Sequence, residues 1–323
     1  MATDDWLHIN RGDELTEDED RKAAACIDEA MKLLAKLCKG YKAHEREKLF
    51  ELCQSVYRLG QKVGERKKWF DRLEADVFAK MNRDDPLPHA VTGSFLIEYA
   101  WDARGSGTAN TVTPDGWKKF KEHLAEAERR LTRDWELDKE LALSHANMVV
   151  VCTGLGHGRD AMEKWVARTL EADPTNVQAL QMKMGYLSPQ WHGKPNETLV
   201  FARQLIQLKN WDSGQPILAL LAHVGMAAVD GNAFNYFRDK PEVWNEVEPI
   251  LAEILRRYPK SSLGASVYFY FSWLSDQNAV RTRDYLKAVE DSGIKLVRGV
   301  FKSEDEMDLA KSWLSQSLEK AEK

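Results

Sequence analysis

The sequence predicts an all-α protein, an α-solenoid of antiparallel helix pairs. Apolar residues recur at helical spacing along most of the chain, and residues 161–187 show the pattern most clearly. Here a first helix with an apolar stripe is followed by the break Asp173-Pro174 and then by a second helix. Prolines at such breaks, Pro174, Pro216 and Pro259, recur about every 43 residues, which is typical of paired-helix repeats.

The repeat extends toward the N-terminus as far as Pro88, and its missing member falls on the polar stretch 132–134, where we expect a break between helices. Three of the prolines are followed, at the fifth position, by a small residue that would let two helices pack closely. These residues are Gly93, Ala179 and Gly264. If the proline spacing is coincidental, the helices remain but the regular array does not.

Three regions are expected along the chain. Residues 1–18 are rich in acids and poor in apolar side chains, which predicts a flexible tail. Residues 19–85 should form an N-terminal helical region, and residues 86–323 a repeat array closed by a capping helix. More than about 60% of the residues should be helical, well above the usual share. The expected helices are 19–39, 43–59, 64–81, 88–103, 114–131, 136–153, 158–172, 175–187, 196–209, 214–229, 241–257, 261–275, 278–291 and 303–320.

Composition narrows the class of protein. The chain has 323 residues, of which 43% are hydrophobic, so it can bury a large core. It has no apolar run long enough to cross a membrane and no secretory signal pattern, so we expect a cytoplasmic protein. Its net charge of −5 makes nucleic acid an unexpected partner. The four cysteines lack metal-site spacing, so we expect buried, reduced thiols, with neither a metal nor a cofactor.

Two stretches carry a resemblance to a known family. Residues 98–117 read EYAWDARGSGTANTVTPDGW and residues 185–203 read GYLSPQWHGKPNETLVFAR, with GLG at 154–156 between them. Over about residues 90–290 the sequence resembles a bacterial family of tetratricopeptide-like proteins whose defining domain has no assigned function. The resemblance implies a helical-repeat fold and no established catalytic activity. His192 and Lys194 stand where family members often have a glycine and a small residue.

A candidate binding surface follows from the expected pairing. The loops within successive pairs, 104–112, 154–158, 188–194 and 230–240, are rich in glycine, and an array would place them on one edge. Several helix N-termini, which attract anions, would begin at this edge. Such a row suits an extended acidic peptide or several phosphates. The candidate residues are Arg104, Ser106, Asn110, His157, Arg159, Trp191, His192, Lys194 and Arg238.

Two functions are compatible with this surface. Since the sequence contains none of the common catalytic motifs, we expect a non-enzymatic scaffold that binds a protein or peptide through its concave face or through this glycine-rich loop edge. The alternative is a hydrolase or transferase acting on an acidic or phosphorylated ligand, in which Arg104, His157 and His192 would converge. We expect Arg104 to contact the ligand, the alternative being that it only ties down its own loop. The sequence leaves the oligomeric state open.

Overall fold

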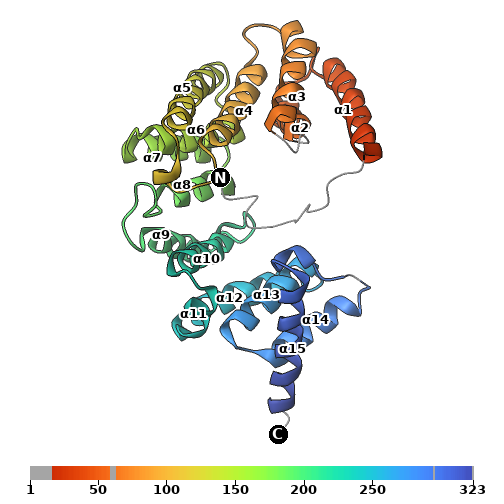
Figure 1. Ribbon diagram of the computed structural model, residues 1–323, viewed down its shortest axis with the longest axis vertical. Helices are drawn as coiled ribbons and strands as arrows, with labels where there is room; N and C mark the ends of the chain where they lie inside the picture. The colour runs from red at the N-terminus through yellow and green to blue at the C-terminus, as the bar shows by residue number, and fades with distance from the viewer. Residues whose placement is uncertain (1–16, 59–62, 294, 322–323) are drawn as a thin grey trace. The chain divides into compact units, whose positions relative to one another are not determined.

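The computed structural model describes residues 17–58, 63–293 and 295–321. The fold is all-α: 78% of the chain is helical, and the described residues include no strand, as predicted. Two compact units are present, an N-terminal unit of Asp13–Lys194 and a C-terminal unit that includes Pro195–Lys323 (Figure 1). Most of the predicted acidic tail, residues 1–16, lies outside the described residues, so its flexibility stays a prediction.

Two long helices of the N-terminal unit begin where the sequence supplies a cap and a proline. Asp85 accepts a hydrogen bond from the amide of Leu87, and Pro86 opens the helix behind it. Thr113 caps the next helix in the same way, through the amide of Gly116 at 3.0 Å. The α-helices are α1 (Glu17–Leu37), α2 (Arg46–Arg58), α3 (Val63–Asp76), α4 (Pro86–Arg104), α5 (Pro114–Leu137), α6 (Ala142–Leu155), α7 (Arg159–Ala172) and α8 (Val177–Tyr186).

The C-terminal unit is built in the same manner. Ser261 caps the fifth of its α-helices through the amide of Gly264 at 3.0 Å, and Pro241 opens the one before it. A short 3-10 turn, Gln215–Ile217, contains Pro216 and leads into a helix. The α-helices are α9 (Glu197–Gln207), α10 (Leu218–Asp230), α11 (Ala233–Arg238), α12 (Pro241–Arg257), α13 (Ser262–Ser275), α14 (Ala279–Glu290) and α15 (Glu304–Ala321).

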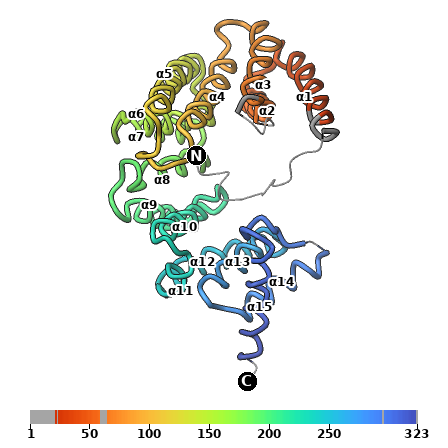
Figure 2. Tube along the Cα trace, in the orientation of Figure 1, coloured from red at the N-terminus to blue at the C-terminus, as the bar shows by residue number. Residues whose placement is uncertain are grey.

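Packing in the N-terminal unit follows the order of the chain. The most extensive contact joins α4 to α5, and α6 then packs on α5, α7 and α8 (Figure 2). At Gly93, a Cβ atom would lie 2.5 Å from Cγ of Leu131, so the small residue does permit the close approach that the sequence predicted. Phe70 and Phe95 stack at 3.8 Å in the core formed by α1 to α4, with the ring of Tyr57 edge-on to Phe95.

In the C-terminal unit α13 is the central element. It packs against α11, α12, α14 and α15, and Phe269, Phe271 and Trp273 on it are buried (Figure 1). A helix buried on so many sides must be apolar all round, which explains why α13 lacks a polar face. Gly264 faces Leu255 of α12, where a Cβ atom would be 3.1 Å from the leucine side chain.

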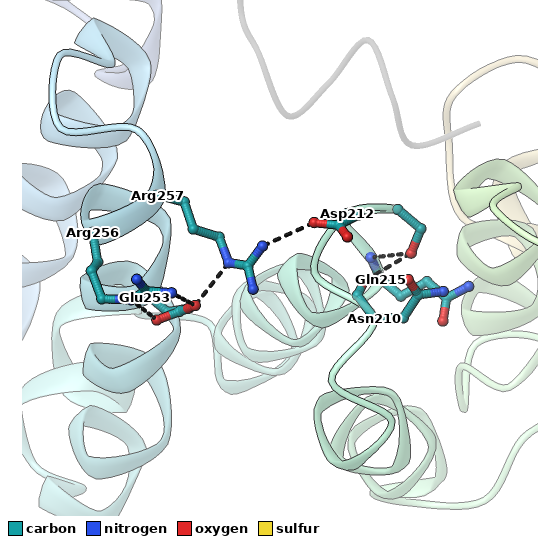
Figure 3. Close-up of polar contacts among 7 residues, drawn as sticks. Asn210, Asp212, Gln215, Glu253, Arg256 and Arg257 are labelled. Carbon is teal, nitrogen blue, oxygen red and sulfur yellow. Dashed lines mark hydrogen bonds and ion pairs between the residues drawn. The ribbon is translucent and has the colours of Figure 1, made fainter.

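A surface network of ion pairs fastens the end of α12. Glu253 lies between Arg256 and Arg257 and accepts hydrogen bonds from both, at 2.6 and 2.7 Å (Figure 3). Arg257 also donates from Nη1 to Asp212 at 2.9 Å, which ties α12 to the segment that follows α9. The pKa of Glu253 falls to about 2 because these two guanidinium groups stabilise its charged form.

Two predicted boundaries are wrong. Residues 132–134 do not separate two helices, because α5 continues through them to Leu137 and buries Asp134. The chain turns only at Asp138, whose side chain accepts a hydrogen bond of 2.9 Å from the backbone amide of Glu140. The predicted loop 230–240 contains α11, which Asn232 caps and which buries Tyr236 and Phe237. Of the four cysteines, Cys38, Cys53 and Cys152 are buried free thiols as predicted.

Cys26 is exposed, contrary to prediction. The buried stripe of α1 runs through Ile27, Met31 and Leu34, and Cys26 lies next to that stripe on the solvent side. No helix in the described part of the chain is both long enough and apolar enough to cross a membrane.

Candidate functional site

Arg104, the last residue of α4, binds the loop that follows it. Its Nη1 donates to the carbonyl oxygens of Gly105 and Gly107, at 3.0 and 3.1 Å. Gly105 has φ 78°, a left-handed conformation that other residues adopt only with strain, and its amide donates to the carbonyl of Trp101 at 2.9 Å. The guanidinium therefore holds a sharp turn in place.

Three indole rings surround the same guanidinium. Its central carbon lies 5.3, 5.2 and 5.7 Å from the ring centroids of Trp101, Trp117 and Trp191. We call these three residues the tryptophan cluster. Each ring is within cation–π range, and Trp101 and Trp191 also meet edge to face at 5.4 Å. Since the rings come from α4, α5 and the loop after α8, Arg104 is the point at which three segments of the N-terminal unit meet.

The loop that carries Trp191 is held by contacts with α6 and α8. The imidazole Nε2 of His192 lies 2.8 Å from the carbonyl oxygen of Thr153 in α6, so this nitrogen carries a proton and donates it. The His192 ring also lies 4.6 Å from that of Tyr186. A Cβ atom at Gly193 would be 1.7 Å from the carbonyl oxygen of Leu187, so this turn accepts glycine alone. The sequence after α8 therefore forms a rigid loop rather than a loose connection.

Two more of the predicted cations of this unit, His157 and Arg159, have acidic partners. His157 Nε2 lies 3.0 Å from Glu128 Oε1, and Arg159 Nε lies 3.7 Å from Oε1 of Glu163, both on the surface. The α7 helix begins beside them at Gly158, with φ 85°, and has no side-chain cap. Ser106, Asn110 and Lys194 are exposed residues of the surrounding loops.

Eight of the nine predicted site residues thus lie in the N-terminal unit. Contacts join Arg104 to Trp191, and His192 to the end of α6 just before His157 and Arg159. The ninth, Arg238, belongs to the C-terminal unit, where its guanidinium lies 5.3 Å from the ring of Phe234. We refer to loops 105–113, 156–158 and 188–194 together as the loop edge.

Sequence reasoning missed the role of Trp101 and Trp117. Both are the tryptophans of the stretch 98–117, but neither is among the candidate residues that the sequence analysis names. In the structure both are partly exposed, and both face Arg104. The signal that could have found them is a single arginine between two tryptophans, in a segment that must turn back on itself.

Away from the loop edge, burial shifts the pKa values of several side chains in contacts between helices. Burial raises the pKa of Asp134 to about 8, although Ser144 donates a hydrogen bond to its carboxyl group. Burial lowers the pKa of His145 to about 4. In the C-terminal unit burial also lowers the pKa of His223, whose Nδ1 lies 2.9 Å from the hydroxyl of Tyr236. These groups lie in contacts between helices and are not part of the loop edge.

A pocket of the N-terminal unit, about 650 Å³ in volume, lies near His157. It is lined by His89 and by charged residues that include Glu128, Arg129 and Arg133. Two of the three arginines lining it are paired with carboxylates: Arg129 with Glu126 at 2.5 Å, and Arg133 with Asp84 at 2.9 Å. Its charges are therefore largely balanced.

No family model matches the chain, and the comparison with curated proteins finds no match either.

Proposed function

We propose that this chain is a cytoplasmic, non-enzymatic interaction scaffold of the tetratricopeptide-like α-solenoid type, and that it binds an acidic protein or peptide at the loop edge. The observation that carries the proposal is that loops 105–113 and 188–194 both contact Arg104, within the tryptophan cluster. Loops that are rigid before binding lose little conformational entropy when a partner docks on them. We favour this edge over the concave helix face for that reason.

Arg104 takes the structural role in this proposal. Its Nη1 donates to its own loop, and we assign the ligand contacts to exposed residues around it: Ser106, Asn110, His157, Arg159 and Lys194. The surface ion pairs of His157 and Arg159 are weak enough to be exchanged for pairs with a partner. Trp191, which is partly exposed, would supply the apolar contact that interface hot spots commonly need.

The enzyme alternative has less support. It requires Arg104, His157 and His192 to act on one ligand, whereas they contact the carbonyls of Gly105 and Gly107, the carboxylate of Glu128 and the carbonyl of Thr153. None of the three lines either described pocket of the molecule. A hydrolase or transferase at the loop edge therefore stays a prediction of the sequence alone.

Affinity capture from the native host, followed by mass spectrometry, would identify the partner. Binding of that partner would then be measured for a variant with Arg159→Ala and Lys194→Ala. The matched control carries Lys48→Ala and Lys121→Ala, which remove the same charge from exposed sites on α2 and α5. We expect the first variant to lose about tenfold in affinity at low salt and the control to bind normally. Equal affinities for the two variants would contradict binding at the loop edge.

A further inference from the structure

The C-terminal unit contains a pocket that the sequence did not predict. It has a volume of about 750 Å³, within the range of small-molecule sites, and is lined by residues of α12, of the turn between α13 and α14, of α14 and of α15. Two tryptophans line it, Trp244 from α12 and Trp313 from α15. The pocket is separate from the loop edge in sequence and in chemistry, so a ligand in it is independent of the proposed scaffold function.

The charge of the lining is mainly negative. Its described lining holds three carboxylates, Glu248, Asp276 and Asp284, and one guanidinium, that of Arg281. Outside the lining, Arg283 forms an ion pair with Asp284 at 2.9 Å, and both side chains are exposed. Arg281 forms an ion pair with Glu248, whose side chain is 18% exposed and also accepts from the hydroxyl of Tyr268. An anionic ligand would meet repulsion here, whereas a cationic ligand would be attracted.

The tryptophans make the pocket more than an acidic surface. Trp313 donates from Nε1 to Oδ1 of Asp276 at 2.6 Å, which fixes the indole against one side of the pocket. Trp244 is held by an edge-to-face contact with Tyr268, their ring centroids being 6.0 Å apart. Indole faces next to carboxylates are the combination that recognises ammonium groups on alkyl chains, by cation–π attraction and by burial of methylene groups.

We infer that this pocket binds a small organic polycation of the alkylammonium class, such as a linear polyamine. Several carboxylates spread around one cavity match several ammonium groups on one flexible molecule. A volume of about 750 Å³ leaves room for a whole flexible molecule that carries several ammonium groups. Inorganic cations would gain the Coulombic attraction but not the contact with the tryptophans.

Isothermal titration calorimetry with spermidine on the full chain tests the inference. We expect saturable binding that weakens with added salt. Asp284→Asn, at a side chain that is 61% exposed, should lower the affinity about three- to tenfold without affecting folding. Trp313→Leu should cause a similar loss, and Trp313→Phe, which keeps an aromatic face, should recover part of it. The matched control is Glu290→Gln, an exposed acid on the same α14 helix that does not line the pocket.

Three results would overturn the inference. The first is the absence of saturable binding at millimolar spermidine. The second is a loss of affinity for Glu290→Gln equal to that for Asp284→Asn, or binding of Mg²⁺ as tight as that of spermidine, since either would indicate attraction by surface charge alone. The third is tighter binding of a lysine- and arginine-rich peptide than of spermidine, which would assign the pocket to a protein partner. Circular dichroism of each variant would confirm that the helices are intact.

Discussion

In both units tryptophan side chains lie next to charged side chains, but the two arrangements differ. In the N-terminal unit the guanidinium of Arg104 occupies the space between Trp101, Trp117 and Trp191, so the protein supplies its own cation. In the C-terminal unit Trp244 and Trp313 line an open pocket together with carboxylates. The same side-chain chemistry therefore builds a structural joint in one place and a candidate ligand site in the other.

The difference comes from where the cation is attached. Arg104 ends α4 and is followed by a tight turn, so its guanidinium reaches two carbonyls of its own loop and the three rings together. Arg281 is in the first turn of α14, and its guanidinium forms an ion pair with Glu248 on α12. A cation that hydrogen-bonds its own loop fills the space between the rings, whereas one that pairs with a carboxylate of the lining leaves the pocket open.

The largest expected effect is on the joint. Gly193→Ala should lower the free energy of unfolding by about 3 kcal/mol, because the new Cβ would overlap the carbonyl oxygen of Leu187 and displace the loop that carries Trp191. Urea denaturation would measure it. Gly185→Ala is the control: its Cβ would meet no atom within 4 Å, and in α8 alanine should add about 0.5–1 kcal/mol. An unchanged stability for Gly193→Ala would mean that the loop is not rigid.

Replacing the arginine of each region by alanine should lower the stability by different amounts. Arg104→Ala should cost about 1–3 kcal/mol, because two hydrogen bonds and the contacts with the tryptophan cluster are lost. Arg281→Ala should cost less than about 1 kcal/mol, because its pair with Glu248 is on the surface and the side chain is 54% exposed. Thermal unfolding of the two variants gives the comparison directly. Equal losses would contradict a structural role for Arg104.

A buried carboxylate of the N-terminal unit and an exposed one of the C-terminal unit should change stability with pH in different ways. The pKa of Asp134 is raised to about 8, so the native state binds its proton more tightly than the unfolded state does. Its contribution to stability is therefore greatest below about pH 4 and is lost as the pH rises from about 4 to 8. Asp134→Asn should remove this dependence and gain on the order of 1–3 kcal/mol relative to the wild type between pH 5 and pH 8. Denaturation at both pH values would measure it, and parallel curves would contradict the raised pKa.

The smallest effect is expected at Glu253 on the surface of the C-terminal unit. Its pKa is lowered to about 2 by Arg256 and Arg257, so its contribution is fully present above about pH 4.5 and is lost as the pH falls from there toward 2. Glu253→Gln should leave stability at neutral pH nearly unchanged and flatten the acid limb of the unfolding curve. An NMR titration of the Glu253 side chain is the sharper check, and an ordinary glutamate pKa would contradict the paired geometry.

Local sequence signals predicted most helices but not the contacts between distant ones. Thr113-Pro114 predicts the start of α5, and Gly93 predicts a close contact that the structure confirms at Leu131. The helix predicted to begin at Pro88 begins two residues earlier, at Pro86. The predicted break at 132–134 is wrong because burial of Asp134 against Ser144 depends on a neighbouring helix. The tryptophan cluster escapes sequence reasoning on the same ground, since Trp191 reaches Arg104 from a loop far along the chain. The regular solenoid repeat stays a prediction.

The contrast between the two regions can be tested in one spectrum. The indole N–H signals of Trp101, Trp117, Trp191, Trp244 and Trp313, assigned by single substitutions to phenylalanine, would be followed by ¹H–¹⁵N NMR during titration with spermidine. We predict that the signals of Trp244 and Trp313 shift progressively and saturate, while those of the tryptophan cluster stay in place because Arg104 already occupies it. Shifts at Trp101, Trp117 and Trp191 without shifts at Trp244 and Trp313 would contradict this contrast.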